Sequence, residues 1–199
     1  MGSNNFDIVV IGSGVIGHSI AFRLKQDAPH LKIAVLGDPV NSLQASRAAA
    51  GMLAPFCECD KADRFFKFCR ESLDKFPEFL RELISVSKIS VHYSFEGSLM
   101  PSSSYRETWE ERKSFFAEEN IPHEIWNIDK VRQKAPYLSQ DCGEVMWVGE
   151  GQVNNRQMHD ALMQASKNLG NHVLEANVSG FIRKGSTLAS AVTDSGNIN

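Results

Sequence analysis

The hydrophobic positions at the start of the chain form a short apolar run that ends in a group of glycines. Residues 8 to 11 read Ile-Val-Val-Ile, and residues 12 to 17 read Gly-Ser-Gly-Val-Ile-Gly. The β-branched run predicts a buried strand, and the segment from 15 to 27 predicts a helix directly after the turn. Residues 32 to 36, Lys-Ile-Ala-Val-Leu, predict a second strand. We therefore expect a βαβ unit within the first 38 residues.

The glycines have the spacing G-x-G-x-x-G between the predicted strand and the predicted helix. In this setting Gly12 permits a tight turn, Gly14 lets a pyrophosphate approach the backbone, and Gly17 lets the helix pack closely on the strand. The unpaired N–H groups at the start of the helix would then face the phosphates. The motif predicts dinucleotide binding.

The end of the second predicted strand departs from the usual dinucleotide-binding pattern. Such folds usually place Asp or Glu there, and the carboxylate accepts hydrogen bonds from the adenosine ribose. Gly37 occupies this position, and Asp38 follows it. Two interpretations remain open: Asp38 reaches the ribose through a shifted turn, or it begins a loop with Pro39 and the backbone alone holds the ribose.

Residues 39 to 55 are small and polar at first, then small and apolar. The run from Ala48 to Ala50 fits a plain helix, but a run without side-chain bulk that ends in Gly51 also suits a segment lying against a flat ligand. Residues 60 to 88 carry aromatic and aliphatic side chains at helical spacing. They predict an amphipathic helix, interrupted near Pro77, whose aromatic stripe belongs to the core.

Polar and apolar residues alternate from 89 to 100, which predicts a hairpin. Beyond it we expect helices at 105–119, 128–135 and 154–168, and strands at 123–128, 144–148, 173–175, 178–182 and 188–192. This layout predicts a nucleotide-binding core, formed by residues 1–88 and 152–199, that is interrupted by a mostly β insertion at 89–151.

Composition narrows the class of protein. Of the 199 residues, 42% are hydrophobic and 23% are charged, which is ordinary for a soluble globular protein. The net charge of −3 and the lack of a long basic run give no reason to expect nucleic acid as a partner. No apolar stretch reaches the length of a membrane span, and the first seven residues lack a signal-peptide pattern. We therefore expect a cytoplasmic protein.

The cysteines and histidines predict no metal site. Four cysteines do not make a disulfide framework at this length, and the pair Cys57-x-Cys59 is too tight for the usual zinc spacing. We expect free thiols in a reducing compartment. We expect His18, His159 and His172, which lie in or beside predicted helices, to be surface or packing residues and not ligands.

The sequence resembles the FAD-dependent amine and D-amino-acid oxidase superfamily, and within it the glycine oxidases. The resemblance runs along the whole chain in order, and its most specific segments are Ser-Arg-Ala-Ala-Ala-Gly-Met-Leu at 46–53, Cys-Glu-Cys-Asp at 57–60, Arg-Phe-Phe at 64–66 and Gly-Glu-Gly-Gln-Val-Asn-Asn-Arg at 149–156. It implies an α/β fold. A Rossmann-like FAD-binding domain (1–88 and 152–199) would be interrupted by an antiparallel β-rich substrate domain (89–151), both incomplete in this chain.

The resemblance also implies which residues bind FAD. The residues that would hold its pyrophosphate are Gly12, Gly14, Val15, Ile16 and Gly17. Those that would contact the ribityl and phosphate region are Ala45 and Ser46. Those that would run beside the isoalloxazine are Ala50, Gly51 and Met52, with Met52 near the substrate. Val178 would pair its backbone with the adenine.

Two further candidates, Asp38 and Arg47, stand where this chain departs from the family. Members of the family carry Glu at position 37, so recognition of the ribose falls to Asp38 or to the backbone. They usually carry a small residue at position 47, where this chain has a large cation.

The implied activity is oxidation of the C–N bond of a small amine or amino acid such as glycine, held with its α C–H against the flavin. Hydride passes to the flavin, the imine hydrolyses, and the electrons pass to O₂ or another acceptor. The cofactor supplies the redox chemistry and the protein supplies positioning. No side chain in this part of the fold needs to act as a general base, so no catalytic residue is assigned.

Members of the family are about twice as long as this chain, and the arginine and tyrosine that grip the substrate carboxylate fall outside it. A chain that stops at residues 194–199 leaves an open strand edge, which needs a cover. We therefore expect the N-terminal fragment of a split or processed flavoenzyme, completed by a second polypeptide.

Two other functions remain open at this point. One is a flavoenzyme of a natural-product pathway that acts on a larger or carrier-bound amine, for which Arg47 and Gly37 would be adaptations. The other is a non-catalytic FAD-binding subunit. NAD in place of FAD would leave the segment Ala-Ala-Ala-Gly-Met without a role.

Overall fold

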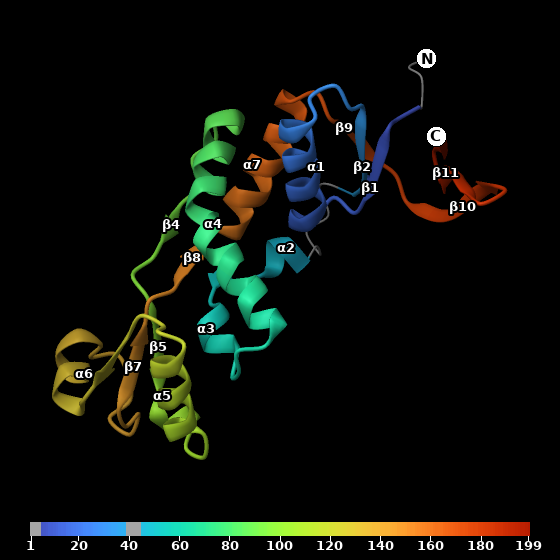
Figure 1. Cartoon of the computed structure of the whole chain (residues 1–199). Helices are drawn as coiled ribbons and strands as arrows, with labels where there is room; N and C mark the ends of the chain where they lie inside the picture. The colour runs from blue at the N-terminus through green and yellow to red at the C-terminus, as the bar shows by residue number, and fades with distance from the viewer. Residues whose placement is uncertain (1–4, 39–44) are drawn as a thin grey trace. The chain divides into compact units, whose positions relative to one another are not determined.

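The computed structural model describes residues 5–38 and 45–199 (Figure 1). The polar start of the small-residue segment, residues 39–44, lies outside the described residues, as do the first four residues of the chain. The chain forms two compact units. Unit 1 contains Met1–Ala50, Phe79–Val91 and Asn154–Asn199, and unit 2 contains Gly51–Glu78 and His92–Val153.

A three-stranded parallel sheet forms the centre of unit 1. Its strands are β1 (Ile8–Ile11), β2 (Ile33–Gly37) and β9 (His172–Glu175), in the order β1-β2-β9. Residues 33 to 36 of the central strand have no exposed surface, which explains why this strand reads as a continuous apolar run. The predicted βαβ unit is confirmed.

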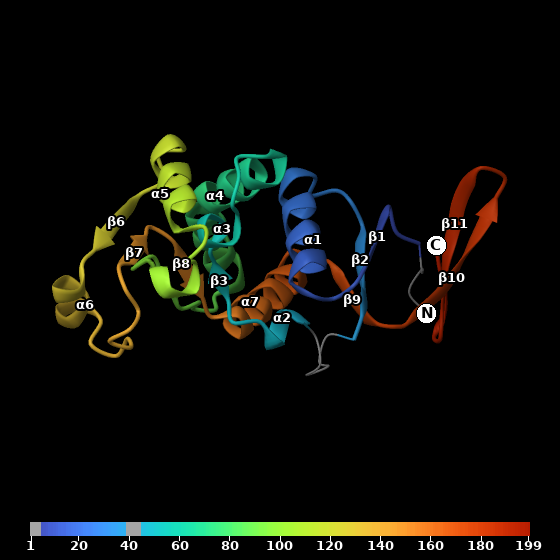
Figure 2. The same cartoon turned by 90° about the horizontal axis from the view of Figure 1, so that it is seen from below.

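Different elements pack against the two faces of this sheet. Ile33 and Val35 pack with Ala21 of α1 (Val15–Asp27). Ala34 and Leu36, which alternate with them along β2, pack against the antiparallel sheet at the end of the chain. Figures 1 and 2 show α1 beside α7 (Asn155–Asn168), on the opposite side of the parallel sheet from that terminal sheet.

The terminal sheet has the order β10-β11-β12, with β10 at Val178–Lys184, β11 at Thr187–Thr193 and β12 at Gly196–Ile198. The strands predicted at 178–182 and 188–192 are confirmed, and β12 was not predicted. The last part of α4 (Arg64–Ser87), from Phe79 onward, also belongs to unit 1. There Phe79 packs edge-on against Phe22 with ring centroids 5.8 Å apart.

Unit 2 contains two small antiparallel sheets. One has the order β3-β8-β4, from Met52–Leu53, Gly151–Val153 and Tyr93–Ser94. The other has the order β5-β7-β6, from Ser98–Pro101, Val145–Val148 and His123–Trp126. The helices of this unit, besides the first part of α4, are α3 (Pro55–Glu58), α5 (Trp109–Glu118) and α6 (Ile128–Lys134), with a 3₁₀ turn at Ser102–Ser104.

Two expectations about these elements are wrong. The hairpin predicted at 89–100 does not form, because β4 pairs with β8 whereas β5 pairs with β7. The helix predicted at 60–88 is not interrupted near Pro77 but runs as α4 from Arg64 to Ser87. Proline removes one N–H from the helix ladder. Here the side chains on both sides of it, including Phe66, Leu80 and Leu83, stay buried and keep the helix continuous.

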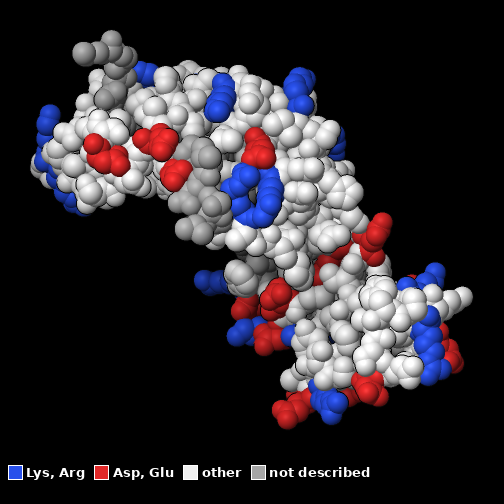
Figure 3. Space-filling view, turned by 180° about the vertical axis from the view of Figure 1, so that it is seen from behind, with Lys and Arg blue, Asp and Glu red and all other residues white. Residues whose placement is uncertain are grey.

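The mixed α/β fold expected from the sequence is confirmed, whereas the predicted domain boundaries stay a prediction; residues 51–78 pack with unit 2. None of the helices in the described ranges is long and apolar enough to cross a membrane. Figure 3 shows acidic and basic side chains interspersed on one face, so the described residues of that face present no continuous basic stripe.

Candidate functional site

The glycine-rich turn between β1 and α1 has the geometry that its spacing predicts. Gly12 adopts a φ of +114°, which favours glycine. Gly17, in the first turn of α1, lies so close to the turn that a Cβ atom there would be 1.9 Å from the Gly12 carbonyl oxygen. The turn therefore excludes side chains at both positions, and the helix begins directly over it.

The segment around Ser46 closes on the start of α1. Gly14 is the N-cap residue of the helix and has no side chain that could cap it, but the Val15 N–H donates to the Ser46 Oγ at 3.0 Å. A Cβ atom on Gly14 would also lie 3.0 Å from this Oγ. The structure thus brings Ser46 to Gly14 and Val15, two other predicted site residues that lie 32 and 31 positions before it in the sequence. Ile16, the next residue of the helix, is 73% exposed.

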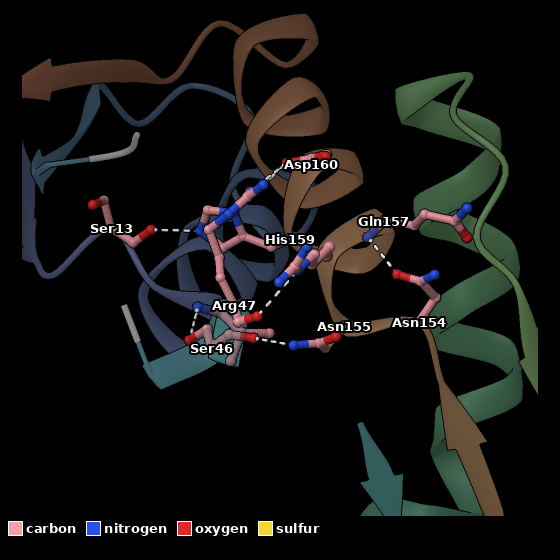
Figure 4. A network of polar contacts seen from close by, with 10 residues as sticks. Ser13, Ser46, Arg47, Asn154, Asn155, Gln157, His159 and Asp160 are labelled. Carbon is pink, nitrogen blue, oxygen red and sulfur yellow. Dashed lines mark hydrogen bonds and ion pairs between the residues drawn. The ribbon is translucent and has the colours of Figure 1, made fainter. Parts of the chain in front are cut away.

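Two side chains of helix α7 donate hydrogen bonds to backbone carbonyl oxygens of α2 (Ala45–Ala48). The Asn155 Nδ2 donates to the Ser46 carbonyl oxygen at 2.7 Å, and the Arg156 Nε donates to the Arg47 carbonyl oxygen at 3.4 Å. The Asn154 side chain caps α7 by accepting from the Gln157 N–H at 3.0 Å. Figure 4 shows Asn154, Asn155 and Gln157 at the start of α7. The first turn of α7 therefore fixes where Ser46 stands.

The Arg47 side chain belongs to a polar network with α7 (Figure 4). Its Nη1 lies 2.7 Å from Asp160 Oδ1 and 3.3 Å from His159 Nδ1. The other ring nitrogen of His159, Nε2, lies 2.9 Å from the carbonyl oxygen of Ser13, inside the glycine-rich turn. His159 has no exposed surface. One buried imidazole thus joins the turn to the predicted ribityl-contact segment.

A second buried histidine lies against the first. The rings of His18 and His159 meet edge to face, with centroids 5.7 Å apart, and His18 Nδ1 lies 3.3 Å from Ser166 Oγ. Burial lowers the pKa of His18 to about 4, and the positive charge of Lys167 lowers it further. His18 and His159 are both buried. His172 is exposed and packs edge-on against Phe6, with centroids 5.1 Å apart.

Gly37 is the last residue of β2, and Asp38 follows it directly. Gly37 has a φ of +154°, and a Cβ atom there would lie 2.8 Å from the Ser13 backbone nitrogen and 2.6 Å from the Ser13 Oγ. This backbone leaves no room for a larger side chain at position 37, where the resemblance led us to expect Glu. Asp38 is partly buried.

The remaining predicted site residues are distributed over both units. Ala50 is exposed at the end of the unit 1 segment, and Val178 is partly buried against the core that contains Ala34 and Leu36. In unit 2, the Gly51 carbonyl oxygen accepts from the Val153 N–H at 2.8 Å. Met52 opens β3 opposite Gln152 and is 58% exposed.

Unit 2 contains a buried carboxylate that was not predicted from the sequence. Glu150 has no exposed surface, and its Oε1 accepts from the backbone N–H groups of Phe56 and Cys57 at the start of α3, the latter at 2.9 Å. Burial raises the pKa of the Cys57 thiol, and a hydrogen bond to Glu150 raises it further. Beside α3 there is a cavity of about 300 Å³, lined mainly by apolar side chains of α3 and α4.

The cysteines form no disulfide, and no cluster of side chains forms a metal site, in the part of the chain that the structure describes. All four cysteines are free thiols. Within the described ranges there is no group of three or more His, Cys, Asp or Glu side chains that could hold a metal ion.

The fold and the glycine-rich turn define a dinucleotide-binding protein, and comparison with known proteins identifies its family. Residues 7–199 match the DAO family of FAD dependent oxidoreductases, so the chain belongs to this family. Its cofactor is accordingly FAD, as predicted.

Its similar proteins include glycine oxidases. The chain is 28% identical over 199 residues to the bifunctional protein ThiO/ThiG of Synechocystis sp. (strain PCC 6803), covering 96% of this chain and 28% of that protein. It is 40% identical over 86 residues to the glycine oxidase of Bacillus licheniformis, covering 43% of this chain and 23% of that protein. The glycine oxidase structure from Geobacillus kaustophilus superposes with a TM-score of 0.88 at 22% identity, covering 98% of this chain and 53% of that one.

The chain thus spans about half of that glycine oxidase structure and less than a third of each of the two sequence relatives. The resemblance to the oxidase superfamily stated from the sequence is confirmed. Sequence reasoning found the turn and Ser46 but missed His159, Asp160 and Asn155 as their supports. The signal available for them was the segment Asn-Asn-Arg at 154–156, whose place at the start of a helix was recognised.

Proposed function

We propose that this chain forms the FAD-binding part of an enzyme that oxidises the C–N bond of a small amine or amino acid. Similar proteins named glycine oxidase support such a substrate. The observation that carries the proposal is the joining of the glycine-rich turn to the Ser46 segment. The Val15 N–H lies 3.0 Å from the Ser46 Oγ, so the two predicted FAD-contact segments meet in one place.

The cofactor fits the residues that are present. Gly12, Gly14 and Gly17 leave the turn without side-chain bulk, so a phosphate can approach the backbone. The start of α1 presents N–H groups and the positive end of the helix dipole, which favour an anion. The residues proposed to hold the pyrophosphate are Gly12, Gly14, Val15, Ile16 and Gly17, with Ala45 and Ser46 beside the phosphate and ribityl region.

Recognition of the adenosine is proposed to depend on the backbone. Gly37 has no side chain and lies against Ser13, so the carboxylate nearest in sequence is that of Asp38. We propose that Asp38 or the neighbouring backbone holds the ribose and that the Val178 backbone pairs with the adenine.

The flavin end of the site is proposed to involve Ala50, Gly51 and Met52. The exposed side chain of Met52 would be available to a substrate. Bound FAD supplies the hydride acceptor, and the protein holds the substrate C–H against it and limits access of water. O₂ or another oxidant would receive the electrons.

We propose that a complete enzyme of this kind is longer than the 199 residues of this chain. The chain covers 53% of the Geobacillus glycine oxidase structure. We propose that the rest of the fold is contributed by further polypeptide, either continuous with this chain or a second, processed chain. Native mass spectrometry distinguishes the two arrangements, and a 22.1 kDa species that is active alone would contradict both.

The cytoplasm is the proposed location. The four free thiols fit a reducing compartment. Fractionation of the source cells tests this, and recovery of the protein outside the cytoplasm would contradict it.

The spectrum of the purified protein tests the proposed function. We expect a flavin absorption spectrum and release of FAD on denaturation. A peroxide assay against glycine, other amino acids and larger amines then identifies the substrate. Protein that carries no flavin and takes up none from solution would contradict the proposal. Activity confined to large amines would favour the natural-product flavoenzyme.

A further inference from the structure

The buried imidazole of His159 contacts both the glycine-rich turn and Arg47. These two contacts determine which of its ring nitrogens carries a proton. The Ser13 carbonyl oxygen can only accept a hydrogen bond, so the ring nitrogen 2.9 Å from it, Nε2, carries a proton. The Arg47 guanidinium can only donate, so the nitrogen 3.3 Å from it, Nδ1, carries none. His159 is therefore the neutral imidazole with its proton on Nε2.

The groups around the ring support this assignment. Asp160 Oδ1 lies 4.0 Å from His159 Nδ1, beyond hydrogen-bond reach, and it pairs instead with Arg47 Nη1 at 2.7 Å. His18, which packs against the ring, has its pKa lowered to about 4 and is neutral at pH 7. Asp160 thus forms an ion pair with Arg47, and an N–H of the Arg47 guanidinium points to His159.

The Ser13 carbonyl that His159 contacts belongs to the same planar peptide unit as the Gly14 N–H. The described residues contain no cis peptide bond, so this C=O and N–H point in opposite directions. A donor that fixes the direction of the C=O therefore also fixes the direction of the N–H at the opposite edge of the same planar unit. Gly14 is the residue whose backbone the G-x-G-x-x-G motif brings to the pyrophosphate.

We propose that His159 is a positioning residue for the cofactor. By donating to the Ser13 carbonyl oxygen it turns the Gly14 N–H toward the pyrophosphate, and Arg47 keeps the imidazole in the tautomer that can do so. The inference rests on the proposed function. It gives Arg47, the large cation in a place where the family usually has a small residue, a role that does not require contact with substrate.

Two similar substitutions separate the two contacts of the ring. In His159→Gln the side-chain amide nitrogen reaches the position of Nε2 and can still donate to Ser13, whereas in His159→Asn it reaches only the position of Nδ1. Titration of the flavin-free protein with FAD, followed by flavin fluorescence, gives the dissociation constant of each. We expect about tenfold weaker binding for H159N, which corresponds to about 1.4 kcal/mol, and binding within about threefold of wild type for H159Q.

A variant of the same helix controls for loss of stability. Leu162 has no exposed surface and lies one turn along α7, so Leu162→Ala lowers the melting temperature without removing a polar contact to the turn. We expect it to leave the dissociation constant for FAD within about twofold of wild type. Nitrogen NMR of His159 in the flavin-free protein is expected to show a proton on Nε2 and none on Nδ1.

The outcomes separate the inference from the proposed function. Wild-type protein that binds no FAD overturns the proposed function and the inference with it. Wild-type protein that binds FAD, with H159N and H159Q equally strong or equally weak, overturns the inference alone. Weakening by L162A equal to that by H159N overturns it as well, because the effect would then be one of general stability. A proton on Nδ1 in the neutral ring would contradict the assigned tautomer.

Discussion

The α-carbon of Gly17 faces the carbonyl oxygen of Gly12 so closely that a Cβ atom would lie 1.9 Å from that oxygen. Both groups are backbone, so neither can turn away as the end of a flexible side chain could. Gly17→Ala is expected to destabilise the chain by about 3 kcal/mol and to abolish FAD binding. Denaturant unfolding and FAD titration measure both effects. Gly180, which has open space around it, provides the control, and a G180A variant as unstable as G17A would contradict the argument.

Gly37 is under two constraints at once. Its φ of +154° disfavours any side chain, and a Cβ atom would also lie 2.8 Å from the Ser13 backbone nitrogen. Gly37→Ala is expected to cost about 2–3 kcal/mol of unfolding free energy. Gly170→Ala, at a φ of +82° with open space around it, carries only the conformational cost of about 1 kcal/mol. Equal losses in the two variants would indicate that the contact with Ser13 has no effect.

The buried carboxylate of Glu150 holds the start of α3 through two backbone N–H groups. Glu150→Ala removes the one oxygen that accepts both hydrogen bonds and leaves the two donors without a partner, which we expect to cost about 3 kcal/mol. Glu150→Gln keeps one acceptor oxygen and is expected to lose about 1 kcal/mol. Thermal unfolding of the two variants tests this, and E150Q as unstable as E150A would point to the charge instead of the acceptor.

Acid is expected to destabilise unit 1 through His18. Its pKa in the folded protein is lowered to about 4 from an ordinary value of 6.5, so between these pH values the unfolded chain binds the extra proton. Stability is therefore unaffected above pH 6.5 and falls as the pH drops toward 4. The loss for this group is on the order of 3 kcal/mol. Denaturant unfolding at pH 7 and pH 4.5 measures it, with His18→Leu as the control; an equal loss in that variant would exclude His18 as the cause.

The local parts of the site were predictable because their signal lies within a few residues. The glycine spacing predicted the turn, and the β-branched run before it predicted β1. The small residues after Ala45 were recognised through a resemblance, and Ser46 does meet the start of α1. Each of these depends on backbone geometry that the residue type itself dictates.

The supports of the site could not be predicted in the same way. His159 lies 146 positions from Ser13, and a single histidine in an amphipathic helix indicates only a packing residue. The hairpin prediction at 89–100 failed for a related reason, since alternation indicates which side chains share a face but not which strand is the partner. The position of Gly37 against Ser13 likewise depends on the packing of β2 beside the turn.

The hydrogen bond from Asn155 to the Ser46 carbonyl oxygen spans 109 positions of sequence. A growing polypeptide emerges from the ribosome N-terminus first, so the glycine-rich turn exists long before α7 can hold the segment that closes on it. Contacts of such large sequence separation also carry a large entropic cost of loop closure, which slows folding. We therefore expect that FAD does not act as an early template for this chain, because the nascent protein must extend past His159 and Val178 before all the proposed contacts with the cofactor exist.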